Sequence, residues 1–259
     1  ITTYRILDDT FNDNIDKLDS FLEVVRSLPF SPKFWAYIRL DLLSKHPETI
    51  QKLVDIGVIS MTFGIETLNQ ETGRIIGKGY NPTKLVETIN YIKDTYGNSI
   101  NMFGHFIIGL PKESPQSTVD TANRIKNKQI KLDGWAFKPL GIKMKNKLVW
   151  DSAFNLDLKK YGYVDKGMYS RSDSGIMINW RNEFMTYDEA VDLGKQISSS
   201  NSFAVGFQEF EIMNLGIDTR DPNINYNFHS VNVIFKEFLE QYKKYVFSYL
   251  NSAEYSTGA

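Results

Sequence analysis

Apolar runs typical of buried strands alternate with amphipathic helical patterns through the first 140 residues of the chain. The run Phe34–Leu40, for example, predicts a strand, while Ile15, Leu18, Leu22 and Val25 recur at the spacing of one helix face. Five predicted strands start near residues 4, 34, 60, 100 and 132. Regular alternation of strand and helix is typical of a parallel sheet with right-handed crossovers. We therefore expect an α/β fold, a partial (β/α) barrel that is TIM-barrel-like but not closed with eight units.

The pattern changes after Pro139. Residues 140–180 are rich in Gly, Lys, Tyr and Ser without clear periodicity, which we interpret as an irregular lid. Thr186 and Glu189 have the spacing of a capping box and predict a helix to about residue 199. A second helix is predicted at 231–250 from its apolar spacing. The chain is therefore divided into a partial barrel and a mostly helical C-terminal extension, at residues 1–140 and 141–259.

The cysteine count of zero excludes several kinds of site. No disulfide, no thiolate zinc site and no iron–sulfur cluster ligated by this chain's own cysteines can form. The three histidines, His46, His105 and His229, form no metal-ligand pattern, so we expect no metal site. A net charge of −1 with dispersed Lys and Arg favours neither nucleic acid nor a membrane surface as a partner. Without a signal-peptide pattern or a run of about 20 apolar residues, we expect a cytoplasmic location.

Charged residues follow the predicted strands one after another. In a parallel barrel the carboxyl ends of all strands lie on one face, so these residues would surround one polar ligand. Carboxylates suit an ammonium group or sugar hydroxyls, and an Arg suits a carboxylate. An alternative stays open, in which each is simply the first polar residue after an apolar strand. The residues concerned are Asp8, Asp9, Arg39, Asp41, Glu66, the turn 109–113 and Lys138.

The stretch 105–113 ends the fourth predicted strand in a tight turn. Gly109 and Pro111 interrupt the apolar run, and Ser114 is placed to cap the next helix. Strand ends of this kind carry ligands in parallel α/β folds. His105 lies within the strand, where two interpretations are equally well supported. Its side chain points into the barrel toward a substrate, or it is a satisfied core histidine.

Four motifs in this order resemble those of radical S-adenosylmethionine (radical SAM) enzymes, most closely the branch often fused to a cobalamin-binding domain. The motifs are Asp8-Asp9-Thr10-Phe11, Arg39-Leu40-Asp41, the stretch 64–72 and the stretch 106–113. The likeness spans residues 4–140 and extends weakly through 161–163 and 180–190. It implies a six-unit partial (β/α) barrel, of which the five units here match the second to the sixth.

The resemblance implies cofactor-binding roles for residues at the first three strand ends. Asp8 and Asp9 fall where the family binds the methionine amine of S-adenosylmethionine. Arg39 is placed to meet the carboxylate of the same methionine group. Glu66 matches a position that the family uses for the ribose hydroxyls. These assignments predict that side chains from three successive strands hold one cofactor.

The fourth strand end is expected to complete the cofactor site. By the resemblance, Ile107 and Gly109 match the segment that packs against adenine. Lys112 stands where the family often has Gly, and Glu113 fits a turn-stabilising residue better than a ligand. The residues expected to face the substrate are His105, Lys138 and the stretch 140–180.

The chain departs from the family in one respect, because the family carries a CxxxCxxC loop that holds a [4Fe–4S] cluster and this chain has no cysteine. The resemblance therefore implies that the cluster lies in a missing N-terminal portion or a companion chain. This chain alone would run no radical chemistry. The implied cofactors are S-adenosylmethionine, that external cluster and, as an open option, cobalamin. The alternative is a cluster-less, degenerate barrel that acts as a structural or protein-interaction module.

Overall fold

The computed structural model of this protein describes residues 3–78, 81–142, 157–172 and 175–199. The chain divides into two compact units, Ile1–Phe210 and Glu211–Ala259, and all described residues belong to the first. The helix predicted at 231–250 and residues 143–156 of the predicted lid therefore lie outside the described residues.

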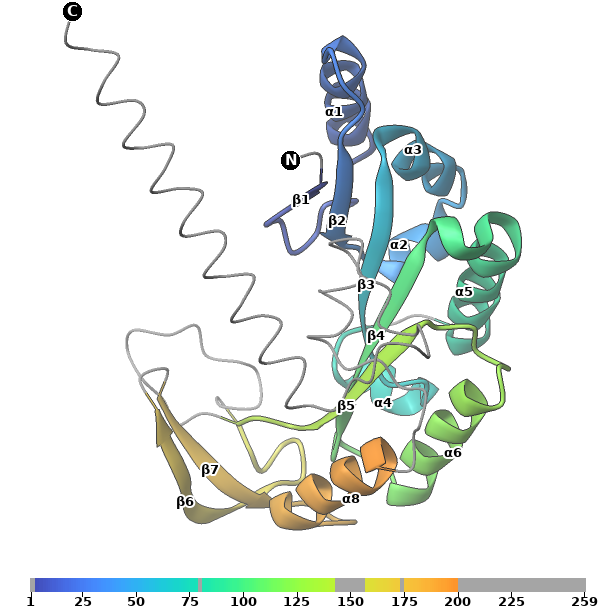
Figure 1. The fold of residues 1–259 in the computed structure, drawn as a ribbon. Coiled ribbons are helices and arrows are strands. Elements are labelled where there is room, and N and C mark those ends of the chain that lie inside the picture. The colour runs from blue at the N-terminus through green and yellow to red at the C-terminus, as the bar shows by residue number, and fades with distance from the viewer. Residues whose placement is uncertain (1–2, 79–80, 143–156, 173–174, 200–259) are drawn as a thin grey trace, which may run out of the picture. The chain divides into compact units, whose positions relative to one another are not determined.

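Five strands of the first unit form one sheet (Figure 1). They are β1 (Thr3–Arg5), β2 (Lys33–Tyr37), β3 (Val58–Glu66), β4 (Asn101–Ile108) and β5 (Gly134–Pro139). Each strand pairs in parallel with the next one along the chain, so the order in space is the order in sequence. This is the arrangement that successive β/α units produce, and it confirms the predicted α/β class.

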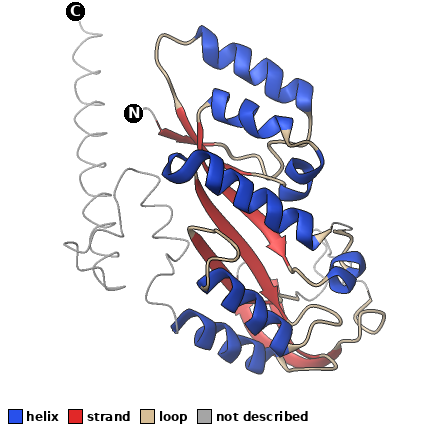
Figure 2. Cartoon of the chain, turned by 90° about the vertical axis from the view of Figure 1, so that its right-hand side faces the viewer, coloured by secondary structure: helices blue, strands red, loops and turns tan. Residues whose placement is uncertain are grey.

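The helices lie together on one face of the sheet, as Figure 2 shows. They are α1 (Ile15–Ser27), α2 (Leu40–Lys45), α3 (Glu48–Ile56), α4 (Gln70–Ile75), α5 (Pro82–Tyr96), α6 (Pro115–Lys126) and α8 (Tyr187–Ser199). The side chains of Asn14, Asn81 and Ser114 accept backbone N–H groups at the first turns of α1, α5 and α6. The predicted Ser114 cap is thereby confirmed.

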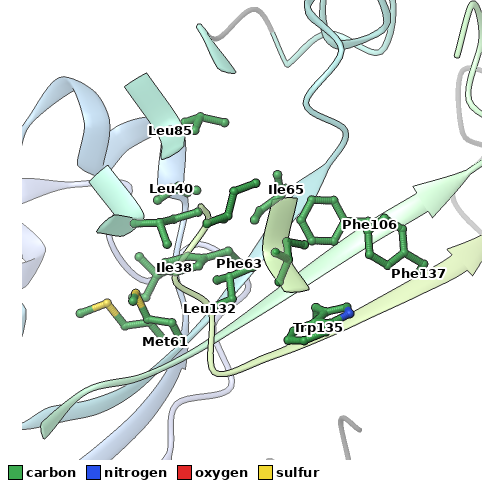
Figure 3. Close-up of a cluster of buried hydrophobic side chains, with 14 of the residues drawn as sticks. Ile38, Leu40, Met61, Phe63, Ile65, Leu85, Phe106, Leu132, Trp135 and Phe137 are labelled. Carbon is green, nitrogen blue, oxygen red and sulfur yellow. The ribbon is translucent and has the colours of Figure 1, made fainter. Parts of the chain in front are cut away.

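The main core lies between the sheet and the helix layer (Figure 3). Side chains alternate between the two faces along a strand. One set of β3, Met61, Phe63 and Ile65, belongs to this core and is at most 1% exposed. Burial of such apolar surface is the dominant favourable contribution to folding. The other set, which includes Thr62 and Gly64, therefore lies on the opposite, inner face of the partial barrel.

The second strand is shorter than the sequence pattern predicts. β2 ends at Tyr37, and Arg39 is the N-cap of the short helix α2, which the apolar pattern did not indicate. The reason lies in a pair of hydrogen bonds with Asn12. The Arg39 amide donates to Asn12 Oδ1 at 2.7 Å, and Asn12 Nδ2 donates to the Arg39 carbonyl at 3.0 Å. A side chain thus satisfies the backbone groups that a longer strand would have paired.

An antiparallel ribbon of two strands, β6 (Val164–Ser172) and β7 (Gly175–Arg181), occupies part of the stretch predicted to be irregular. That part of the prediction is wrong. The pairing shifts register between Asp165 and Met168 and again between Met168 and Ser170. Such irregularities interrupt the period-two alternation by which a strand is recognised in a sequence.

Helix α8 confirms the capping box predicted at Thr186. The Thr186 amide donates to Glu189 Oε2 at 2.7 Å, and the Glu189 amide donates to Thr186 Oγ1 at 3.2 Å. The helix packs against β5 and beside α6. Gly194 permits this close approach, because a Cβ there would lie 3.2 Å from the Phe137 carbonyl oxygen. The helix that follows the ribbon therefore extends the helix layer over β5.

Candidate functional site

A cavity of about 640 Å³ lies at the carboxyl ends of β2 and β3 and along the inner face of the sheet. Its volume falls in the range of ligand sites, roughly 300–1,000 Å³. The walls carry both signs of charge and include four of the predicted site residues. The acidic, basic and histidine side chains in the lining are Asp9, Arg39, Asp41, Glu66, Lys78 and His105.

Arg39 is held at the cavity by Asp41. Its Nε donates to Asp41 Oδ1 at 3.1 Å and its Nη2 to Asp41 Oδ2 at 2.7 Å, which is a bidentate ion pair. Burial opposes ionisation of Asp41, but the hydrogen bond and charge of Arg39 outweigh it and lower the Asp41 pKa. The guanidinium keeps further N–H donors that suit a ligand carboxylate. Asp9 is exposed and lines the same cavity from the loop after β1.

Glu66 ends β3 in a strained conformation. Its φ is 65°, in the left-handed region that residues other than glycine rarely adopt. Gly64 leaves room for the carboxylate, because a Cβ there would lie 2.7 Å from Glu66 Oε1. Burial raises the pKa of Glu66, while Lys78, whose Nζ lies 3.6 Å from Oε1, acts in the opposite direction. A carboxylate held in this way can accept hydrogen bonds from ligand hydroxyls.

His105 lies half-buried on the inner face of β4 and lines the cavity. Its ring stacks with Tyr37 at a centroid distance of 6.5 Å and contacts Phe103 at 4.9 Å. Burial, followed by the charge of Lys138, lowers the His105 pKa to about 4. The imidazole is therefore neutral near pH 7. His105 thus faces the cavity and also packs among aromatic rings, and its role toward a substrate stays a prediction.

Three predicted residues do not line this cavity. Asp8 accepts hydrogen bonds from the Thr10 amide at 2.8 Å and from Lys17 Nζ at 3.0 Å, and these contacts lower its pKa. Asp8 thereby stabilises the loop after β1. Ile107 and Lys138 are register partners on β4 and β5; Ile107 is half-buried and Lys138 is exposed.

Gly109 is the fourth predicted residue outside the cavity lining. It packs against Trp180 of β7 and contacts residues that flank the ribbon. Its φ is 86°, and a Cβ would lie 2.2 Å from a ring carbon of Trp180. The Gly109 carbonyl accepts hydrogen bonds from the Tyr163 hydroxyl at 2.7 Å and from Asn182 Nδ2 at 3.0 Å. Packing against the extension is therefore sufficient to require glycine here.

The turn after Gly109 is stabilised from within. Lys112 has a φ of 62°, and the Glu113 amide donates to the Leu110 carbonyl at 3.2 Å, as in a type II turn with its left-handed third position. Glu113 is buried and accepts hydrogen bonds from Thr67 Oγ1 at 2.8 Å and Ser117 Oγ at 3.2 Å. The predicted turn-stabilising role of Glu113 is confirmed by these contacts.

Sequence reasoning missed Tyr37, Thr62 and Lys78 in the cavity lining. Tyr37 and Thr62 are register partners in β2 and β3, and their alternation with buried apolar residues was an available signal. Lys78 follows α4 and carried no such signal. Among the described residues, no group of three or more potential metal ligands is present. No helix in the described part combines the length and apolar character needed to cross a membrane.

Comparison with known proteins shows what this chain is similar to. Residues 4–125 match the model of the radical SAM superfamily. The fold is similar to a radical S-adenosylmethionine methyltransferase, TsrM, from Kitasatospora setae, with cobalamin and a [4Fe–4S] cluster bound. The TM-score is 0.59 at 11% identity, over 83% of this chain and 48% of that one. The same enzyme with tryptophan substrate and the SAM analog aza-SAM bound has a TM-score of 0.52 at 11% identity, over 74% and 42%.

A relative in Methanocaldococcus jannaschii, an uncharacterized protein, is 32% identical over 85 residues, which are 32% of this chain and 23% of that protein. This chain spans less than half the length of each of these proteins. At 11% identity the likeness to TsrM shows the fold alone. The family match, in contrast, includes β1 to β4 and the Arg39 and Glu66 strand ends. Residues 4–125 of this chain are therefore similar to the radical SAM superfamily.

Proposed function

We propose that the cavity binds S-adenosylmethionine and that this chain is the cofactor- and substrate-binding part of a radical SAM enzyme. One observation carries the proposal: Asp9, Arg39, Glu66 and His105, from four strand ends or strands, line a single cavity. Asp9 would bind the methionine amine, Arg39 the carboxylate and Glu66 the ribose hydroxyls. His105 would face the substrate as a neutral imidazole.

The charges of the cavity suit this ligand. S-adenosylmethionine carries an ammonium group, a sulfonium group and a carboxylate, and the lining offers carboxylates together with one guanidinium. For Asp8, Ile107, Gly109 and Lys138 a ligand-binding role stays a prediction, since they do not line the cavity.

The [4Fe–4S] cluster of the family does not fit this chain, because the 259 residues include no cysteine to ligate it. We therefore propose that another segment or chain supplies the cluster and that this chain alone is inactive. Cobalamin belongs to the TsrM structure, and we assign it no residue here. A cytoplasmic location is part of the proposal.

Calorimetric titration of the 259-residue chain with S-adenosylmethionine tests the proposal. We expect Arg39→Gln to weaken binding about 10-fold or more, since a hydrogen bond to a charged group contributes about 1.5–3 kcal/mol. Arg26→Gln, on the exposed surface of α1, is the matched control and should bind as the wild type does. Equal weakening by both substitutions would contradict the assigned site.

The lack of cysteine also favours a second candidate function, a cluster-less structural or protein-interaction module. The two functions differ in their response to a supplied cluster-bearing segment. A radical SAM enzyme part should then support reductive cleavage of S-adenosylmethionine, which yields 5′-deoxyadenosine and methionine. If S-adenosylmethionine does not bind even with that segment present, the enzyme proposal fails and the module remains.

A further inference from the structure

Side chains from the ribbon and its flanking residues converge on the carbonyl of Gly109. The Tyr163 hydroxyl donates at 2.7 Å and Asn182 Nδ2 at 3.0 Å, and both side chains are buried. A carbonyl oxygen has two lone pairs, so these two donors fill its capacity. Trp180 covers the glycine itself and donates from Nε1 to the Leu140 carbonyl at 2.7 Å. Three residues of the extension, Tyr163, Trp180 and Asn182, thus hold the end of β4.

The turn after β4 in turn fixes the loop after β3. Thr67 Oγ1 donates to Glu113 Oε1 at 2.8 Å, and Thr72 Oγ1 donates to the Pro111 carbonyl at 2.9 Å. Both bonds are buried, where an unmade hydrogen bond is costly. Thr67 directly follows Glu66, whose left-handed backbone lines the cavity. A continuous set of contacts therefore leads from the extension to the cavity.

We propose that Tyr163 and Asn182 are positioning residues for the cavity. They fix the Gly109 carbonyl and thereby the turn that contains Glu113. Glu113 in turn holds Thr67, the residue that follows Glu66 in the chain. The barrel strands alone do not complete the site; the extension sets the turn that holds the strained Glu66 backbone. The inference rests on the proposed function for the identity of the ligand only. It also limits what Gly109 can offer a ligand, because its carbonyl is already saturated by protein donors.

A connected path of packed and hydrogen-bonded groups carries the coupling from the extension to the cavity. Tyr163→Phe is the sharpest perturbation, because it removes one hydroxyl and keeps the buried ring. Tyr91→Phe is the matched control, since it removes a phenol hydroxyl from an exposed side chain of α5. Hydrogen exchange of the ligand-free, 259-residue chain is the first measurement, and calorimetric titration with S-adenosylmethionine is the second.

In Tyr163→Phe we expect the amides of Glu113 and Thr67 to exchange at least about 3-fold faster, since the net contribution of one hydrogen bond corresponds to about 2- to 10-fold. These amides donate to the Leu110 and Ile65 carbonyls at 3.2 and 2.8 Å. The affinity for S-adenosylmethionine should fall by a similar factor. Tyr91→Phe should change neither measurement, and the central amides of β3 should keep their protection in both variants.

A faster exchange of Glu113 alone, with Thr67 and the affinity unchanged, would overturn the proposal, because the effect would then end at the turn. Loss of protection throughout β3 in Tyr163→Phe would also overturn it, since the residue would then support the whole fold. If the wild type binds no S-adenosylmethionine, the proposed function fails separately. The exchange of Thr67 then decides the positioning role without any ligand.

Discussion

Glu113 is a buried carboxyl whose proton equilibrium should make the stability of this protein depend on pH. The residue is 3% exposed, and Oε1 accepts hydrogen bonds from Thr67 and Ser117. Oε2 has no hydrogen-bond partner among the described residues. Burial raises the Glu113 pKa to about 7, although the two hydrogen bonds act in the opposite direction. Against the ordinary value of 4.5, this pKa corresponds to about 3 kcal/mol.

The sign of the effect follows from which state of the protein binds the proton. Below pH 4.5, Glu113 is protonated in both the folded and the unfolded chain, so it adds no pH dependence. Between pH 4.5 and about 7 the unfolded chain releases its proton while the folded chain retains it, so the free energy of unfolding falls as the pH rises. Above the folded pKa the full contribution of about 3 kcal/mol has been lost.

Glu113→Gln removes this equilibrium and keeps a carbonyl oxygen as acceptor for the Thr67 and Ser117 hydroxyls. Urea unfolding of the wild type and the variant at a series of pH values between about 5 and 8 gives the two free energies of unfolding. We expect the variant to gain about 2–3 kcal/mol relative to the wild type across this range. Glu23→Gln, on the exposed face of α1, is the control and should run parallel to the wild type. A Glu113→Gln difference that stays constant within about 0.5 kcal/mol would refute the raised pKa.

Two further substitutions test the geometry of the strand ends. In Gly64→Ala the new Cβ would lie 2.7 Å from Glu66 Oε1, so the carboxylate must move. The affinity for S-adenosylmethionine should fall about 10-fold, with little change in the melting temperature. Unchanged affinity would show that the Glu66 carboxylate does not contact this ligand. Lys112→Gly should be about 1 kcal/mol more stable than Lys112→Ala, because both lose the exposed ion pair with Glu183 but only glycine relieves the φ of 62°. Equal melting temperatures would contradict that reasoning.

The sequence could predict those parts of the fold that depend on local patterns. The alternation of apolar runs and helix faces predicts five parallel units, and the sheet has that order. Local hydrogen bonds are equally visible in a sequence, so the Ser114 cap and the Thr186 box are confirmed. The carboxyl ends of parallel strands lie on one face, and this depends on topology alone. The sequence therefore also predicted that Arg39 and Glu66 line one cavity.

Long-range packing could not be predicted. Gly109 is a motif residue in the sequence, but its carbonyl partners lie 54 and 73 residues further along the chain. Nothing local indicates that Tyr163 and Asn182 meet there. The Asp8–Asp9 pair shows a second limit, since neighbouring residues point in different directions. Asp9 lines the cavity, whereas Asp8 bonds to Lys17.

The place of α8 over β5 has a consequence for how the chain acquires its fold. β4 is joined to α6 by a turn of a few residues, whereas β5 ends at Pro139 and α8 starts at Tyr187. The connection from β5 to α8 is roughly eightfold longer than the turn from β4 to α6, which raises the entropic cost of closing it in the unfolded chain by about 2 kcal/mol. Contacts of such high sequence separation form late. On the ribosome, the first four β/α units can therefore assemble before α8 has been synthesised, and the outer side of β5 stays uncovered during that time. Its duration is set by chain growth at about 5–20 residues per second.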